Sequence, residues 1–397
     1  MNILDGLKVV DCTQILAGPF CTMMLGDMGA EITKVEKPNG GDDIRRFGPP
    51  FIDGESAAFL MINRNKKSIA LNMKDPKGLK ILKELIEDAD VFIQNFRPGA
   101  LEKMGLGYDD VIKNINPKII YCSISGFGSN GPYKNRPGFD LIAQGMSGLM
   151  SLTGTPNGEP VKIGVPICDL NAGVYAALGI LASYIKRLKT NKGQFVETSL
   201  LESGLSYTIW ESGIYFATKE VSKQSGTAHR LSAPYQSFKT SDGYINIGAA
   251  NQANWEKLCN ALKRADLKEN IEFIDNASRM SNVDKLVDIL NVEFTKNTTS
   301  DWVEILIENG VPCGPILNID EILNHDQIKE REMIIDINHT KLGKIQNLNF
   351  PIKFSDSEKR TILPPPLLGE HNEIILKELG YSKDDIQLFE KENVITS

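Results

Sequence analysis

The stretch LKVVDCTQILAGPFCTMMLGDMGAEITKVEK (residues 7–37) sets the fold class of this chain. A short β-branched run opens it, a helical pattern follows at 18–30, and a second strand-like run closes it at 31–37. Comparable strand-like or helical patterns follow at 67–72, 76–89, 90–96 and 118–125. Strands that lie about one helix apart in the sequence indicate βαβ units. The sequence therefore predicts an α/β fold built on a parallel sheet.

The pattern changes beyond the polar stretch KEVSKQSGTAHR (219–230), which indicates a domain boundary. Residues 235–262 show a strand, a turn, a strand, a loop and a helix, and amphipathic helices follow. The 397 residues also exceed what one compact core usually holds. We therefore expect a large domain at 1–200, a linker at 201–225, a smaller α+β domain at 226–330, and a C-terminal segment at 331–397 that returns to the large domain.

Composition and charge exclude several classes of protein. The net charge of -7 at pH 7 provides no basic surface for a nucleic acid, so we expect no such partner. The 6 cysteines show neither C-x-x-C pairs nor metal-ligand spacing, which predicts reduced thiols in a cytoplasmic protein without a metal site. No signal peptide is expected, because the first residues run directly into a strand-like segment. The most apolar stretch, 173–188, is shorter than the roughly 20 residues that span a bilayer, so we expect a buried core helix and no membrane partner.

In a parallel sheet, ligands bind beyond the carboxyl ends of the strands. The segments in that place are QILAGP, KPNGG, NFRPG and GFGSNG. The first continues as ILAGPFCTMMLG, which lacks the second and third glycines of a dinucleotide fingerprint. A nicotinamide-dependent oxidoreductase is therefore a weak alternative, and we expect neither a nicotinamide nor a flavin. Basic side chains near these segments are either solvated surface charges or, together, a site for a phosphorylated ligand; they are Lys34, Lys37, Lys74, Arg97 and Lys103.

Asp140 is the only charged residue between Arg136 and Glu159. An aspartate at the start of a helical pattern is often an N-cap. Here, nearby glycines permit close approach of a ligand, and Gln144 lies one helical turn away, where it can hydrogen-bond the carboxylate. We therefore identify Asp140 as a candidate nucleophile. No histidine occurs in the first 228 residues, which excludes a Ser–His–Asp or Cys–His arrangement inside the first domain.

Several segments resemble, in chain order, those of the class III CoA-transferases, also called the CaiB/BaiF family. They are LDGLKVVDCTQILAGPF, MGAEITKVEKPNGGDDIRRFGPPF, NRNKKSIALNMKDPKG, NFRPGALEKMGLGY, SISGFGSNGPYKNRPGFD and PPPLLGEH. The resemblance extends from about residue 3 to 380 and is greatest to members that move CoA from succinyl-CoA to glutarate and related dicarboxylates. It implies a Rossmann-like large domain, a smaller domain, and an interlocked homodimer in which each chain threads through a ring formed by the other.

The resemblance also assigns roles to residues of this chain. It implies that Asp140 attacks the acyl-CoA, giving a mixed anhydride and then an aspartyl-CoA thioester, from which CoA passes to the acceptor acid. The implied contacts to coenzyme A are Leu16, Ala17, Lys37, Leu71, Lys74, Asn95, Phe96, Arg97, Lys103, Ser125, Gly126, Phe127 and Gly128. The implied or nearby substrate residues are Arg45, Arg46, His229, Gly248, Ala249, Ala250 and Asn251.

Three features of these residues leave alternatives. Arg45 or Arg46 either grips the distal carboxylate of a diacid or pairs with Asp42 and Asp43, and Arg45 matches the family arginine. The loop 248–251 is either a connection or a lid over the site. Leu16 stands where formyl-CoA transferases have glutamine, and GAANQ replaces their run of glycines, so formate and oxalate are not expected.

Two other functions compete with CoA transfer. An α-methylacyl-CoA racemase of the same superfamily needs an acid/base pair, but GFD stands here where racemases have G-H-D. His229 would then have to approach in three dimensions. A non-enzymatic CoA-binding or scaffold protein is the other alternative, and the intact Asp140 argues against it.

Overall fold

A computed structural model describes residues 2–356 and 361–396, and its contacts divide the chain into two units. Unit 1 combines the residues up to Leu149 with Lys162–Gly213 and the residues from Gln327 onward. Unit 2 combines Met150–Val161 with Ile214–Asp326. Residues 150–161 therefore group with the small unit, although the sequence placed them in the large domain. The expected linker at 201–225 is largely helical, because α9 (Leu200–Leu205) and α10 (Ile209–Thr218) occupy much of it.

Unit 1 contains a six-stranded sheet with the order β5-β2-β1-β6-β7-β8. Every neighbouring pair in it is parallel, which confirms the predicted parallel sheet. The strands are β1 (Lys8–Asp11), β2 (Glu31–Glu36), β5 (Lys66–Ala70), β6 (Val91–Gln94), β7 (Ile120–Ser125) and β8 (Gln194–Ser199). Counted in chain order, this is the 3-2-1-4-5-6 arrangement of a Rossmann fold, and its order reverses between β1 and β6.

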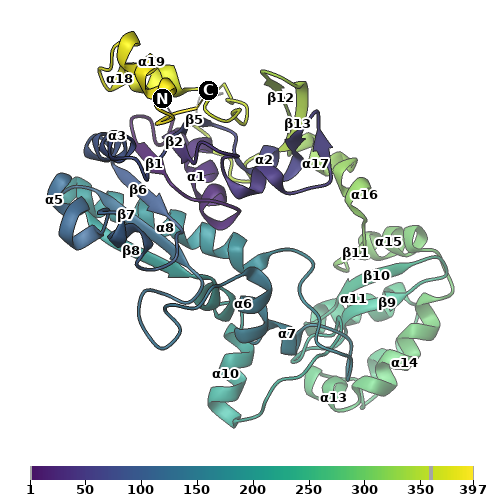
Figure 1. Cartoon of the computed structure of the whole chain (residues 1–397). Helices are drawn as coiled ribbons and strands as arrows, with labels where there is room; N and C mark the ends of the chain where they lie inside the picture. Colours follow the sequence, from purple (N-terminus) through teal and green to yellow (C-terminus); the bar gives the residue numbers. More distant parts are fainter. Residues whose placement is uncertain (1, 357–360, 397) are drawn as a thin grey trace. The chain divides into compact units, whose positions relative to one another are not determined.

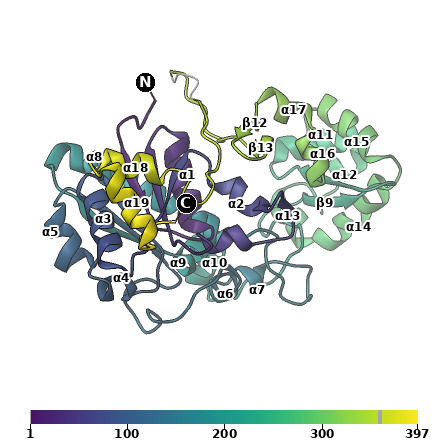
Figure 2. The same cartoon turned by 45° about the horizontal axis from the view of Figure 1, so that its top comes forward.

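Helices cover both faces of this sheet (Figure 1). On one face, α1 (Ala17–Asp27) packs on α8 (Ile167–Thr190), where Gly173 lies so close to α1 that a Cβ atom would stand 2.6 Å from the Ala17 carbonyl oxygen. On the other face, α3 (Pro76–Glu87) shares a core with the C-terminal helices, which lie beside it in Figures 1 and 2; they are α18 (Asn372–Glu378) and α19 (Lys383–Lys391).

The helix α3 shows why the local sequence adopts this structure. Its apolar residues Ile81, Leu82 and Ile86 recur at helical spacing and are all buried in the core. The Asp75 side chain accepts a hydrogen bond from the Lys77 backbone N–H, and proline occupies the first helical position. Both features satisfy the requirements of a helix N-terminus.

The remaining elements of unit 1 are short. They include two antiparallel pairs, β3 (Phe51–Ile52) with β4 (Glu55–Ser56) and β12 (Ile334–His339) with β13 (Gly343–Leu348). The short helices are η1 (Asp43–Arg46), α2 (Ala57–Ile62), α4 (Ala100–Lys103), η2 (Tyr108–Ile112), α5 (Lys113–Ile115) and α6 (Asp140–Met146). The helix α7 (Leu149–Leu152) lies where the chain first passes from unit 1 to unit 2.

Unit 2 is a smaller α+β structure, as the sequence predicts. Its three-stranded antiparallel sheet consists of β9 (Tyr235–Lys239), β10 (Tyr244–Gly248) and β11 (Cys313–Pro315). Large buried side chains, among them Trp255, Phe273 and Phe294, form its own core. Its helices are α11 (Gln252–Ala261), α12 (Ala265–Glu269), α13 (Asn276–Ser281), α14 (Val283–Phe294), α15 (Thr299–Glu308) and α16 (Ile319–Leu323), while α17 (Asp326–Glu330) leads back to unit 1.

By length and composition, α8 could cross a membrane. With 24 residues it is longer than the apolar stretch that the sequence suggested. However, Ala172, Ala176 and Ile180 are fully buried in the core of unit 1, where α8 contacts α1. The helix therefore has the packing of a core helix in a globular unit.

Candidate active site

Two cavities lie side by side at the carboxyl ends of the strands in unit 1. The first, of about 260 Å³, is lined by residues that follow β1, β6, β7 and β8. The second, of about 510 Å³, is lined by residues that follow β2, β5 and β6. Because Gln14 and Phe96 line both, the two form one crevice at the point where the strand order reverses. This is the place where open α/β sheets bind their ligands.

The loop after β1 is fitted closely into this crevice. A Cβ atom on Gly18 would stand 2.2 Å from the Thr13 Cβ, so only glycine fits there. The loop is joined to the segment after β6 by two hydrogen bonds: the Gln14 N–H donates to Asn95 Oδ1 at 2.9 Å, and Asn95 Nδ2 donates to the Gln14 carbonyl oxygen at 2.7 Å. Leu16 and Ala17, which were predicted to contact CoA, line the first cavity.

Asp140 is the first residue of α6, and its carboxylate points to the N-terminus of α8. Its Oδ1 accepts hydrogen bonds from the backbone N–H groups of Cys168, at 2.8 Å, and Asp169, at 3.3 Å. Its Oδ2 accepts from Gln144 Nε2 at 2.6 Å, the contact that the sequence suggested. Unpaired N–H groups and the helix dipole make this end of α8 favourable for an anion. The carboxylate of Asp140 is therefore hydrogen-bonded on both oxygens.

Asp169, the third residue of α8, lines the first cavity together with Ala17, Ser125 and Gly126. Burial and the neighbouring Asp140 carboxylate raise the pKa of Asp169 to about 7. Two carboxyl groups that share one region tend to separate in pKa, which is a common feature of catalytic sites. The structure thus presents Asp169 to the crevice and uses Asp140 to hold the start of α8.

The sequence analysis did not single out Asp169. It lies in PICDLNAG, before the apolar helix, and an aspartate in the first turn of a helix is common. A signal was nevertheless available, because Asp169 is the only acidic residue between Glu159 and Glu197. Asp140 is identified as a candidate from the same kind of signal, a single charged residue in a long uncharged stretch.

The predicted cations differ in their surroundings. Lys37 and Lys74 line the second cavity with Leu71, and Lys37 also forms a solvent-exposed ion pair with Asp43 at 2.5 Å. Arg97 lines a smaller adjacent cavity of about 50 Å³ with Ser125. By contrast, Lys34 is fully buried and paired with Asp42, so it is unavailable to a ligand.

The other predicted CoA contacts follow strands of the same sheet. Asn95 and Phe96 line the first cavity after β6. After β7, the Gly128 N–H donates to Ser125 Oγ at 2.9 Å, and the ring of Phe127 packs edge-on against Tyr133. Lys103 is the last residue of α4.

Arg45 and Arg46 have different partners. The guanidinium of Arg45 makes two hydrogen bonds of 2.7 Å to the buried Glu36 carboxylate, lies 3.6 Å from the centre of the Phe59 ring, and has a side chain that is only 9% exposed. Arg46 has a side chain that is 63% exposed and pairs with Asp43. The surface pairing considered from the sequence is thus observed for Arg46, whereas Arg45 is held by Glu36.

The remaining candidates belong to unit 2. Gly248 ends β10, and the buried Ala249 donates its N–H to the Pro234 carbonyl oxygen at 3.0 Å. Ala250 precedes Asn251, whose side chain caps α11 by accepting from the Asn254 N–H at 2.8 Å. The ring of His229 packs edge-on against Tyr235. The loop 248–251 therefore has a defined conformation within unit 2.

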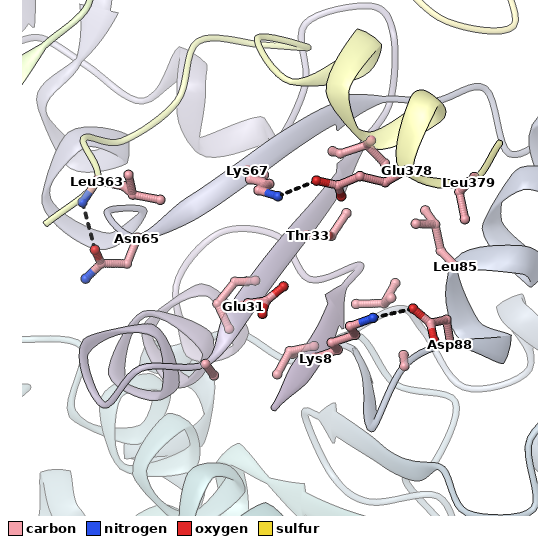
Figure 3. Close-up of a pocket in the computed structure, with 16 residues that line it drawn as sticks. Lys8, Glu31, Thr33, Asn65, Lys67, Leu85, Asp88, Leu363, Glu378 and Leu379 are labelled. Carbon is pink, nitrogen blue, oxygen red and sulfur yellow. Dashed lines mark hydrogen bonds and ion pairs between the residues drawn. The ribbon is translucent and has the colours of Figure 1, made fainter. Parts of the chain in front are cut away.

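A further cavity of about 390 Å³ lies at the opposite edge of the sheet (Figure 3). It is lined by the amino ends of β1, β2 and β5, by α3 and by α18. Besides Glu31, its charged side chains pair with one another, Lys8 with Asp88 at 2.5 Å and Lys67 with Glu378 at 3.0 Å. Because both lysines are paired, this cavity is a weaker candidate for binding an anionic substrate.

A Rossmann-type sheet with basic side chains and a carboxyl group of raised pKa in the crevice at its switch point indicates an enzyme that acts on a phosphorylated ligand. The chain belongs to CoA-transferase family III, whose family model matches residues 4–372. The family and the enzyme class that the sequence predicted are therefore confirmed.

Individual relatives agree with this membership. The chain is 44% identical over 376 residues to succinyl-CoA:glutarate CoA-transferase of Homo sapiens, covering 95% of this chain and 86% of that protein. It is 37% identical over 393 residues to succinyl-CoA:mesaconate CoA-transferase of Haloarcula marismortui, covering 96% of this chain and 97% of the relative. The crystal structure of a CAIB/BAIF family protein from Brucella suis matches with a TM-score of 0.85 and 38% identity, covering 96% of this chain and 100% of that one.

Proposed function

We propose that this enzyme transfers CoA from succinyl-CoA to a small dicarboxylic acid and that Asp169 is its nucleophile. The observation that carries the second part is that Asp169 lines the cavity formed by Leu16, Ala17 and Gly126, at the switch point of the sheet. The first part is supported by relatives at 37–44% identity that are named for succinyl-CoA and a dicarboxylate.

The reaction proceeds by covalent catalysis. The Asp169 carboxylate attacks the thioester carbonyl of the donor, the C–S bond breaks, and a mixed anhydride and CoA thiolate form. The thiolate attacks the aspartyl carbonyl of the anhydride, which releases the donor acid and leaves an aspartyl-CoA thioester. The acceptor carboxylate attacks this thioester, which frees the CoA thiolate and forms a second mixed anhydride between Asp169 and the acceptor. The thiolate then attacks the acceptor carbonyl of that anhydride, which gives the new acyl-CoA and restores the Asp169 carboxylate. Water would hydrolyse both intermediates, so the partly buried position of Asp169 suits the chemistry.

The proposal gives Asp140 a supporting role rather than the nucleophilic one that the resemblance implied. Hydrogen bonds to a carboxylate stabilise its charge and hold it in place, which makes it a weaker nucleophile, and Asp140 accepts them from Cys168, Asp169 and Gln144. We propose that Asp140 fixes the start of α8 and, through its charge, keeps the pKa of Asp169 high.

The two cavities suggest how CoA binds. The second cavity, with Lys37 and Lys74, suits the phosphate groups, because ammonium groups at strand ends can bind them with charge-assisted hydrogen bonds. The first cavity then receives the thioester beside Asp169. Arg46 is the candidate for the distal carboxylate of a diacid, since its side chain is exposed and its partner Asp43 also pairs with Lys37.

Mass spectrometry tests the nucleophile. After incubation of the enzyme with succinyl-CoA and digestion, we expect a succinyl or CoA adduct on the peptide that contains Asp169. Asp169→Asn should abolish the adduct and the transfer, whereas Asp140→Asn, the matched control, should keep an adduct on Asp169. An adduct on Asp140, or near-normal transfer by Asp169→Asn, would return the role to Asp140.

A panel of acceptor acids tests the substrate. We expect succinyl-CoA to donate CoA to glutarate or a related diacid far more efficiently than to butyrate, which has the same type of chain but no second carboxylate. Equal use of glutarate and butyrate would reject the dicarboxylate proposal and leave the family assignment intact.

We also propose that the protein is an interlocked homodimer located in the cytoplasm and that the loop 248–251 acts as a lid. The dimer is supported by the exposed apolar side chains of α8, and the location by the six cysteines, all of which are free thiols. The lid is supported by the small residues of this loop, which permit close approach of a ligand.

A further inference from the structure

The loop that follows β1 contains a strained residue. Ile15 has a φ angle of 69°, in the left-handed region that β-branched residues rarely adopt. Such strain persists only where the surroundings hold the residue in place, and it is often found at functional sites. The neighbours of Ile15 in this loop, Leu16 and Ala17, line the cavity that contains Asp169.

A buried ion pair holds this loop. Asp42 Oδ1 accepts the Ile15 N–H at 2.9 Å, while Asp42 Oδ2 accepts from Lys34 Nζ at 2.8 Å. Lys34 Nζ also donates to the Thr13 carbonyl oxygen at 3.0 Å. The side chains of Lys34 and Asp42 are both 0% exposed. The pair therefore contacts the backbone on both sides of Gln14, and Gln14 and Ile15 themselves line the cavity with Leu16 and Ala17.

This arrangement is not explained by stability alone. A buried ion pair often stabilises a fold no better than apolar side chains of similar size, because both charges lose their hydration. Charged groups that grip a strained backbone can instead fix one conformation of it. Lys34 thus supports the loop that lines the crevice, although its side chain is buried and cannot contact a ligand.

We infer that Asp42, supported by Lys34, is a positioning residue that keeps the loop at 14–17 in its strained conformation, so that Leu16 and Ala17 are in place for acyl-CoA before it binds. The inference rests on the proposed function in one respect, namely that the first cavity receives the thioester end of CoA. Without the hydrogen bond from Ile15 to Asp42, the loop would relax, and CoA binding would have to restore the strain.

Two double variants test the acceptor role of Asp42, whose Oδ1 accepts the N–H groups of Ile15 at 2.9 Å and Ile44 at 3.1 Å. K34M/D42N removes both charges and keeps an oxygen that can accept the Ile15 N–H, whereas K34M/D42L removes both charges and the acceptor. By isothermal titration with CoA, we expect K34M/D42N to bind nearly as wild type does. We expect K34M/D42L to bind roughly 5- to 100-fold more weakly, the range that backbone strain of this kind represents in an equilibrium constant.

A third change at the strained residue provides the decisive readout. Glycine adopts a positive φ without strain, so I15G added to K34M/D42L should restore the affinity for CoA to within about fivefold of wild type. Because the Ile15 side chain also lines the cavity, the control is I15A in the same background, which removes that side chain equally but keeps a Cβ atom and should not restore the affinity. A merely structural role of the ion pair would lower the melting temperature without this rescue. Equal CoA affinity of the two double variants, or no rescue by I15G in a folded protein, would overturn the inference.

A second test does not depend on the ion-pair variants folding. Ile15→Pro fixes φ near −65° and removes the N–H, so we expect the same loss of CoA affinity, with Ile15→Gly as the control. If both single variants bind CoA alike, the inference is wrong. Failure of the wild-type enzyme itself to bind CoA would reject the proposed function as well.

Discussion

Asp169 in the first turn of α8 and Asp140, whose carboxylate reaches that turn from α6, differ in their partners. Asp140 accepts hydrogen bonds from the backbone of Cys168 and Asp169 and from the side chain of Gln144. Asp169 lines the cavity, and burial together with the charge of Asp140 raises its pKa to about 7. A carboxylate of raised pKa is more basic than an ordinary one and is ionised only when the pH exceeds that value. The environment, rather than the residue type, thus distinguishes the two groups.

This pKa makes a prediction about activity. In the proposed mechanism the ionised form of Asp169 is the nucleophile, so kcat/KM should fall as the pH drops below about 7. In Asp140→Asn the neighbouring negative charge is gone, so this acid limb should move to lower pH. A pH profile of kcat/KM with succinyl-CoA measures both, and an acid limb unchanged by Asp140→Asn would contradict the coupling.

The same pKa predicts a pH-dependent change in stability. The folded protein binds the Asp169 proton up to a pH of about 7, whereas the unfolded chain releases it near pH 4. Stability contributed by this group is therefore present at low pH and is lost as the pH rises toward 7. The asparagine of Asp169→Asn does not titrate, so wild type loses stability between pH 5 and pH 8 that the variant does not lose. The free energy of unfolding of the variant minus that of wild type should therefore be larger at pH 8 than at pH 5, by more than about 1 kcal/mol. Denaturant unfolding at the two pH values tests this, and an equal difference at both would contradict it.

Arg45 and Arg46 should respond differently to removal of their side chains. Arg45→Ala leaves the buried Glu36 carboxylate without its bidentate partner, which should cost about 3–5 kcal/mol of stability. Arg46→Ala removes an exposed pair with Asp43, which should cost less than about 1 kcal/mol. With glutarate and butyrate as acceptors, Arg46→Ala should weaken the preference for the diacid. A stable Arg45→Ala variant that loses this preference would assign the contact to Arg45 instead.

At the scale of elements, the β1–α1 connection combines close packing with a ligand-binding surface. Gly18 leaves no space for a side chain beside Thr13, and Asp11 at the end of β1 accepts the Thr13 N–H at 2.9 Å. A methyl group at Gly18 must displace Thr13 and with it the loop that lines the cavity. Because the connection between β1 and α1 is short, a larger residue at position 18 cannot be accommodated without moving the loop.

Replacement of this glycine should weaken both folding and binding. Gly18→Ala is expected to cost about 1–3 kcal/mol in stability, as overpacking does, and to raise the Kd for CoA. The matched control is Gly213→Ala, because an added Cβ there meets nothing within 4 Å inside α10. Thermal unfolding and CoA titration measure the two effects, and equal behaviour of the two variants would contradict the steric argument.

The helix α8 has a second apolar face besides its buried one. Five apolar side chains lie exposed on it, with exposed fractions of 40–69%: Val174, Tyr175, Leu178, Ile185 and Leu188. Exposed apolar surface of this extent on one helix is typical of an interface. We expect the partner subunit of the homodimer to cover it.

Analytical ultracentrifugation, which measures the oligomeric state, tests this expectation. The wild-type protein should be a dimer at micromolar concentration, with no folded monomer. Leu178→Glu places a charge on the exposed face and should lower the yield of dimer, whereas Lys186→Glu, elsewhere on the same helix, should not. A folded wild-type monomer at micromolar concentration would reject the interlocked homodimer.

At the scale of the whole molecule, the crevice is built by unit 1 alone. All residues that line its two cavities belong to that unit, and each unit has its own hydrophobic core. Ligand binding and the stability of unit 2 are therefore separable by experiment.

Hydrogen exchange in the presence of CoA tests this division. We expect slower exchange for the loop at 14–17 and for residues 71–74 and 95–96, which line the cavities. Exchange within α14 of unit 2 should not change. Protection of α14 as strong as that of the loop at 14–17 would show that CoA binding is not confined to unit 1.

The sequence by itself determined the architecture of the large unit and the place of its crevice. Alternating strand and helix patterns specify βαβ units, and their right-handed crossovers bring the strand ends to one edge. For this reason the segments QILAGP, KPNGG and NFRPG could be assigned to the crevice from pattern alone, and the two cavities are lined by residues of all three. The sixth strand, β8, which follows the long helix α8, is not among the elements that the sequence predicts. Local patterns sufficed because the fold follows from repeated units.

Only the tertiary structure decided the roles of individual charged residues. Asp140 meets its partners 28 and 29 residues further along the chain, at Cys168 and Asp169. Lys34 is buried against Asp42, and Arg45 against Glu36. A charged side chain binds a ligand, caps a helix or forms an internal pair according to its burial and its neighbours, and these come from segments that are distant in the sequence. Periodicity and spacing describe only what is near in the chain, so they place such residues in the crevice but do not determine which of them face it.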